Sequence, residues 1–187
     1  MRLNHETPPG KLYHGTSGSS AEQIVLSGGI CPPASSPELA SRYLLPNASH
    51  RPDPRYVYLI PTSFEAIMFG VVRAVGLKWN PGLGLYEINP FVKGKDHDSV
   101  VVFDVNAEDL NESHLRKSDL FRDEVAYEGI IDVSRGISIA HFPMTRRLYE
   151  FARDIQTPEL LKKYVGMDLI DYLHGEQFEA EGSHTAK

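Results

Sequence analysis

The chain has 187 residues, a net charge of -6 and a single cysteine, Cys31. An apolar content of 41% and a charged content of 24% are typical of a globular protein, and we expect one domain over residues 1–187. The composition argues against disulfides and a cysteine-rich zinc site, and the scattered histidines argue against any structural metal. The negative charge argues against nucleic acids and anionic membranes as partners.

The N-terminal part of the chain predicts a strand followed by a helix. Residues 11–16, KLYHGT, are expected to form the strand, and residues 17–20, SGSS, a turn. A capping box within residues 19–23 then begins a helix that ends at Gly28. Residues 30–54 carry six prolines and predict a long loop, with a helical piece near residues 38–45.

Strands and one further helix are expected in the middle of the chain. Residues 55–60, RYVYLI, alternate as a strand does, and Thr62 or Ser63 caps a helix that reaches residue 72. Further along, the pattern predicts strands at 83–88 and 99–105, a short helical piece at 106–112 and a charged loop at 113–123.

The C-terminal part predicts helix. Thr157 and Pro158 are typical of a helix start, and an apolar stripe at helical spacing continues to Gly175. We therefore expect a helical part over residues 146–175 and tails at 1–10 and 176–187. The order of elements predicts an α+β fold of small sheets with helices on one flank.

The stretch from Phe121 to Ile139, FRDEVAYEGIIDVSRGISI, contains the first candidate site residue. Its charged turn leads directly into short runs rich in β-branched and aromatic residues, which predict strands. Glu124 is therefore expected where a loop becomes a strand, which would hold its carboxylate firmly beside a cleft. The alternative interpretation is a solvated loop acid.

Two other stretches carry candidate site residues. In the first, His14 is followed by Gly15 and Thr16 at a strand end, where ring nitrogens and backbone groups can bind a ribose hydroxyl and an amide. In the second, Tyr58 on a strand precedes Phe69 on a helix, and two such aromatic rings can enclose a flat heteroaromatic ring. The alternative interpretations are a hydrogen-bonded core histidine and two core aromatics.

Taken in this order, the three stretches resemble mono-ADP-ribosyltransferase domains. KLYHGTSGSSAEQIVLSGGI resembles the first strand and helix of cholera-type toxins, with His14 in the place of their arginine. His14, Tyr58 and Glu124 together resemble the His-Tyr-Glu pattern of the diphtheria-type and poly-ADP-ribose polymerase branch. The resemblance covers about residues 11–141 and implies the ADP-ribosyltransferase fold, with an NAD cleft between small antiparallel sheets.

The resemblance implies catalysis on NAD as co-substrate, with release of nicotinamide. By this resemblance, His14 and Gly15 bind the adenosine ribose and the nicotinamide amide, with Thr16 beside them. Tyr58 stacks on the nicotinamide, Phe69 supplies a second ring, and Glu124 binds the nicotinamide ribose. Cleavage produces an oxocarbenium-like sugar and a neutral leaving group, so one well-placed carboxylate meets the main electrostatic demand.

The resemblance also places Phe121 and Arg122 on a turn that faces the acceptor. Family members that modify arginine usually have a glutamate or glutamine where this chain has Arg122. Because a guanidinium repels an incoming arginine, we expect a protein acceptor residue other than arginine.

Three alternatives remain open from the sequence. They are a non-catalytic NAD-binding module, an NAD glycohydrolase that uses water as acceptor, and an RNA 2′-phosphotransferase, which the net acidity disfavours. The first residues contain no secretory signal and no segment reaches membrane-spanning length. We therefore expect action in a cytoplasm, as a toxin, an injected effector or a housekeeping enzyme.

Overall fold

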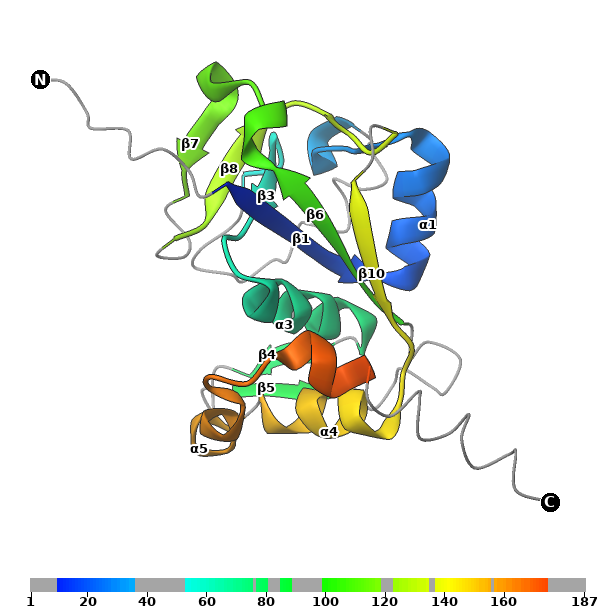
Figure 1. The fold of residues 1–187 in the computed structure, drawn as a ribbon, viewed down its shortest axis with the longest axis vertical. Coiled ribbons are helices and arrows are strands. Elements are labelled where there is room, and N and C mark those ends of the chain that lie inside the picture. The colour runs from blue at the N-terminus through cyan, green and yellow to red at the C-terminus, as the bar shows by residue number, and fades with distance from the viewer. Residues whose placement is uncertain are drawn as a thin grey trace, which may run out of the picture. The chain divides into compact units, whose positions relative to one another are not determined.

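The computed structural model describes residues 10–35, 53–75, 77–80, 85–88, 99–118, 123–134, 137–155 and 157–174. These residues form an α+β fold of small antiparallel sheets and a few helices, as the sequence predicted (Figure 1). The chain divides into two compact units. The first unit comprises Met1–His14, Glu22–Thr62 and Phe103–Ile139, and the second comprises Gly15–Ala21, Ser63–Val102 and Ala140–Lys187. A single domain over 1–187 stays a prediction.

The first unit contains an antiparallel sheet with the strand order β3-β8-β7. Strand β3 is Tyr56–Leu59, β8 is Val125–Glu128 and β7 is Leu115–Lys117. The first two strands confirm the sequence prediction. Strand β7 corrects it, because residues 113–123 were expected to be a loop and Leu115 instead lies opposite Tyr127 on β8.

The first unit also contains a two-stranded pairing that the sequence did not predict. Strand β2, Gly29–Ile30, pairs antiparallel with β9, Ile131–Asp132. Gly28 precedes β2 with a φ of 76°, a left-handed conformation that glycine adopts without strain. Within the expected long loop, Pro33–Ser35 forms a 3-10 turn, η1. The helical piece expected near residues 38–45 lies outside the described residues.

Another sheet has the strand order β1-β6-β10, with β1 at Lys11–Ser17, β6 at Val100–Asn106 and β10 at Ser138–Phe142. Strand β6 is buried at nearly every position, in keeping with its run of valines. Two 3-10 turns follow it, η2 at Ala107–Asp109 and η3 at Glu112–His114, where one short helical piece was expected.

Helix α1, Gly18–Ser27, begins earlier than its sequence predicted. The side chain of Ser17 accepts a hydrogen bond from the backbone N–H of Ser20 at 3.4 Å, so Ser17 caps the helix. The expected turn at residues 17–20 is therefore the first turn of α1, because an earlier serine supplied the cap. The helix ends before Gly28, as predicted.

The second unit is mainly helical. Its helices are α3 at Ser63–Ala74, α4 at Arg146–Asp154 and α5 at Pro158–Leu161, and its strands β4, Leu77–Asn80, and β5, Leu85–Ile88, pair antiparallel. Helices α3 and α4 lie side by side (Figure 1), joined by the ring of Phe64 against that of Phe151 at 5.9 Å. The ring of Phe151 also contacts that of Tyr164 at 4.8 Å, which makes it a centre of this core.

The prediction of a single long helix from Thr157 to Gly175 is wrong. Helix α5 ends at Leu161, and a 3-10 turn, η4, Lys162–Tyr164, follows it. Gly166 then has a φ of 79°, which interrupts the helix before residues 169–174 form a new one. The apolar stripe still packs in part, because Leu169 and Leu173 are buried.

A buried carboxylate joins α4 to the turn η4. Asp154 is 1% exposed and accepts hydrogen bonds from the Tyr164 hydroxyl and the Arg153 guanidinium, both at 3.0 Å, and it pairs with Lys163. Burial by itself raises the pKa of Asp154. The hydrogen bonds from Lys163, Arg153 and Tyr164 together outweigh burial and hold this pKa below its ordinary value of 3.8.

We expect this carboxylate to make the stability of the chain depend on acid. Since its pKa is lower in the folded state, its contribution is complete above pH 3.8 and is lost as the pH falls through the folded value. Urea unfolding at a series of acidic pH values should therefore show a steeper loss of stability in the parent chain than in Asp154→Asn. Glu159→Gln, at an exposed position of α5, is the control. An equal pH dependence for Asp154→Asn and the parent chain would contradict this assignment.

No helix among the described residues is both long enough and apolar enough to cross a bilayer.

Candidate active site

His14 lies on β1, next to the strand that carries Tyr58. Its Nδ1 is 3.1 Å from the carbonyl oxygen of Tyr58. Because a carbonyl only accepts, Nδ1 carries the proton in this contact and Nε2 is the other ring nitrogen, an acceptor in the neutral imidazole. Beside this contact, Tyr13 and Ile60 exchange two backbone hydrogen bonds, at 2.7 and 2.9 Å. The contact therefore fixes the histidine ring against β3.

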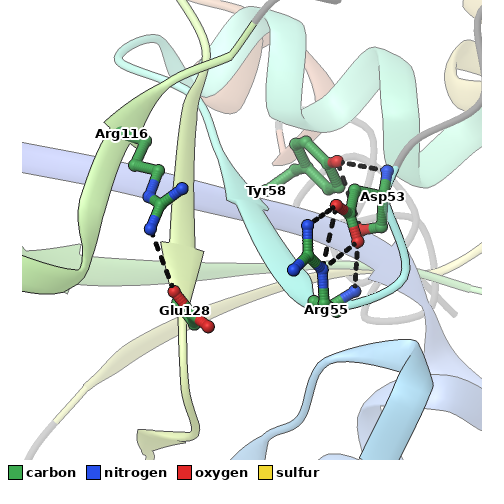
Figure 2. Close-up of polar contacts among 5 residues, drawn as sticks. All are labelled: Asp53, Arg55, Tyr58, Arg116 and Glu128. Atoms are coloured by element: carbon green, nitrogen blue, oxygen red, sulfur yellow. Dashed lines mark hydrogen bonds and ion pairs between the residues drawn. The ribbon is translucent and has the colours of Figure 1, made fainter.

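Tyr58 has a half-buried ring whose hydroxyl is bound at its far end. The hydroxyl accepts a hydrogen bond from the backbone N–H of Asp53 at 2.6 Å and lies 3.3 Å from the Asp53 carbonyl (Figure 2). The Asp53 carboxylate is in turn held by the Arg55 guanidinium, with a closest approach of 2.6 Å. That hydrogen bond, with a further contribution from Arg116, holds the pKa of Asp53 below its ordinary value. Both ends of the tyrosine are thus fixed.

Glu124 immediately precedes β8, where the sequence placed it, at the change from turn to strand. It is 5% exposed, so the alternative interpretation as a solvated loop acid is wrong. Its Oε2 accepts a hydrogen bond from the Ser118 hydroxyl at 2.5 Å, and its carbonyl accepts from the Ser118 backbone N–H at 2.9 Å. A buried carboxylate held by a hydroxyl donor has a fixed position, which electrostatic catalysis requires.

Strand register places Tyr58 and Glu124 on one face of the β3-β8-β7 sheet. Tyr58 lies directly opposite Ala126, and Glu124 is two residues before Ala126, just outside β8. The hydrogen bond from the Ser118 N–H to the Glu124 carbonyl continues the pairing of β7 with β8 as far as Glu124. Side chains two residues apart on an extended segment point to the same face, as do directly opposite residues. Arg116 is also directly opposite Ala126, on β7. Tyrosine, glutamate and arginine therefore share this face.

Arg116 and Ser118 were not predicted as site residues from the sequence. Both lie within residues 113–123, which the sequence predicts to be a loop. In a loop, the faces of successive side chains cannot be predicted. Arg116 pairs with Glu128 at 3.4 Å across β7 and β8 (Figure 2), and its guanidinium lies 5.6 Å from the centre of the Tyr56 ring. Residues 115–118, LRKS, contain a single apolar residue, so the sequence has no alternation that would identify a strand here.

The remaining predicted site residues are Gly15, Thr16, Phe69, Phe121 and Arg122. Gly15 and Thr16 follow His14 on β1, where Thr16 is 6% exposed and a Cβ built on Gly15 would lie 1.7 Å from the carbonyl oxygen of Ala66 on α3. Phe69 is half-buried on α3, in the second unit. Phe121 and Arg122 lie outside the described residues.

A scan against protein-family models, a search of curated proteins and a search of solved structures gave no match for this chain.

The bond between Ser118 and Glu124 has a measurable consequence for stability. We expect Ser118→Ala to lower the free energy of unfolding by about 1.5–3 kcal/mol, because it removes a buried donor to a charged acceptor. Ser118→Thr keeps the hydroxyl that donates to Glu124, so it should retain most of the stability. Urea unfolding of the three proteins is the measurement, and equal losses for the two variants would contradict a role for the hydroxyl.

Proposed function

We propose that this chain is an NAD-dependent mono-ADP-ribosyltransferase with the ADP-ribosyltransferase fold, which transfers ADP-ribose to a protein acceptor and releases nicotinamide. The observation that carries the proposal is the grouping of His14 on β1, Tyr58 on β3 and Glu124 immediately before β8, all within one unit. His14 contacts β3 at Tyr58, and Glu124 shares a sheet face with Tyr58. These are the three side chains that resemble the His-Tyr-Glu pattern.

Each residue has a role that its surroundings suit. The ring of Tyr58, held at its hydroxyl, offers a flat surface for the nicotinamide, and stacking there orients the bond to be cleaved. His14, whose Nδ1 binds the Tyr58 carbonyl, is assigned to the adenosine ribose by the family resemblance. Glu124 stabilises the positive charge that develops on the nicotinamide ribose as the carbon–nitrogen bond breaks. Nicotinamide leaves as a neutral molecule, so no general acid is needed.

Gly15, Thr16 and Phe69 belong to the second unit, and only the family resemblance assigns them to NAD binding. The structure gives Gly15 a packing role against Ala66 in addition.

The fate of NAD tests the proposal. The purified full chain should release nicotinamide from NAD and, with a cell lysate present, should attach labelled ADP-ribose to protein. Release of nicotinamide with no transfer to any protein would instead identify an NAD glycohydrolase. A chain that binds NAD without turnover would be a binding module, and the proposal would fail.

A further inference from the structure

We propose that Arg116 selects a carboxylate side chain, of aspartate or glutamate, as the acceptor of ADP-ribose. This inference rests on the proposed transferase activity and names the acceptor chemistry of the same site. Three residues lie side by side across the sheet, because Tyr58 on β3 and Arg116 on β7 are both directly opposite Ala126 on β8. Neighbouring strands are about 4.8 Å apart, so tyrosine and arginine stand about 10 Å apart with one methyl group between them.

The order of the strands indicates from which side the acceptor approaches the sugar. Strand β8, which Glu124 precedes, lies between β3 and β7. If nicotinamide stacks on Tyr58, it leaves on the β3 side of the carboxylate. A nucleophile that approaches the opposite face of the sugar then arrives on the β7 side, where Arg116 stands.

The guanidinium of Arg116 is placed to bind an incoming anion. The side chain is 62% exposed, and its ion pair with Glu128, 47% exposed, is at the surface, where such pairs are weak. Its contact with the Tyr56 ring keeps it over the sheet while Glu128 can be replaced by another carboxylate. Guanidinium binds carboxylates through two parallel hydrogen bonds, and it repels the side chains of arginine and lysine.

A carboxylate acceptor also agrees with the chemistry of Glu124. A carboxylate oxygen forms the new bond to the ribose carbon, the bond from that carbon to nitrogen breaks, and nicotinamide leaves with the electron pair. The acceptor is already ionised, so no proton has to be removed. Glu124, fixed by Ser118, can then act purely as an electrostatic group.

The test compares Arg116→Gln with a control on the same strand, Lys117→Gln. Both side chains are exposed, and each change removes one positive charge from β7. Lys117 lies opposite Val125 and not Ala126, so its side chain points to the other face of the sheet. The full chain is incubated with NAD and one of four peptides that differ at a single residue, which is glutamate, glutamine, arginine or phosphoserine. Mass spectrometry measures modified peptide, and a separate assay measures nicotinamide.

We expect the parent chain to prefer the glutamate peptide. The ratio of peptide modified to nicotinamide released should fall about tenfold or more in Arg116→Gln and stay within about twofold in Lys117→Gln. Arg116→Lys keeps the positive charge but lacks the planar guanidinium that donates two parallel hydrogen bonds. Its ratio of modified peptide to nicotinamide should lie between those of the parent chain and Arg116→Gln. Preference for the arginine or phosphoserine peptide, or equal ratios in the two glutamine variants, overturns the acceptor assignment while nicotinamide release persists. Absence of nicotinamide release in the parent chain overturns the transferase activity as well.

Discussion

Replacement of Glu124 by glutamine is expected to lower the rate of nicotinamide release from NAD by a factor of about 100 or more. The carboxylate is 5% exposed and bonded to the Ser118 hydroxyl, so it is fixed and largely shielded from water. A charge in such surroundings acts strongly on a developing cation. Glutamine keeps the size of the side chain and can still accept the serine hydrogen bond, so the loss should come from the charge alone.

Glu128→Gln is the matched control for this change. Glu128 is the last residue of β8 and lies on the same face, four residues from Glu124, but it is exposed and bound only weakly to Arg116 among the contacts described. Nicotinamide release by Glu128→Gln should stay within about threefold of the parent chain, because an exposed charge is screened by solvent. Equal rates for the Glu124 and Glu128 variants, with folding unchanged by circular dichroism, would exclude Glu124 from the chemistry.

The strands of the site sheet show what the sequence could and could not predict. Strands β3 and β8 were predicted because YVYL and VAYE join β-branched and aromatic residues in short runs. Strand β7, LRK, has only three residues and two of them are charged, a pattern that predicts a loop. What makes it a strand is its pairing with β8, a contact between residues distant along the chain that local propensity does not contain.

The same distinction applies to the candidate site. The position of Glu124 followed from a local feature, a charged turn that leads into an apolar run. Its hydrogen-bond partner did not, because Ser118 lies across the turn and meets the carboxylate only when β7 pairs with β8 in one register. Likewise the bond from His14 to the Tyr58 carbonyl joins residues 44 positions apart. The sequence can therefore indicate which residues form a site. The contacts between these residues depend on the pairing of strands that are distant along the chain.

Two roles are assigned to Gly15, one in NAD binding and one in packing against α3. The family resemblance assigns it to NAD binding, yet a Cβ built there would lie 1.7 Å from the Ala66 carbonyl oxygen and 2.5 Å from its carbonyl carbon. Both atoms belong to the backbone of α3 and cannot rotate away. We expect Gly15→Ala to lower the free energy of unfolding by about 3 kcal/mol or more, since strand and helix must separate to admit the methyl group. Urea or thermal unfolding measures this loss.

Gly10→Ala provides the comparison within the same segment of chain. A Cβ on Gly10 meets nothing within 4 Å, so this variant should differ from the parent chain by no more than about 0.5 kcal/mol. If Gly15→Ala is as stable as Gly10→Ala but no longer binds NAD, the glycine serves the ligand and the close approach of α3 does not require it. If it is strongly destabilised, close packing of the strand against α3 is sufficient to require glycine next to His14, and lost turnover in that variant cannot be counted as evidence for NAD binding.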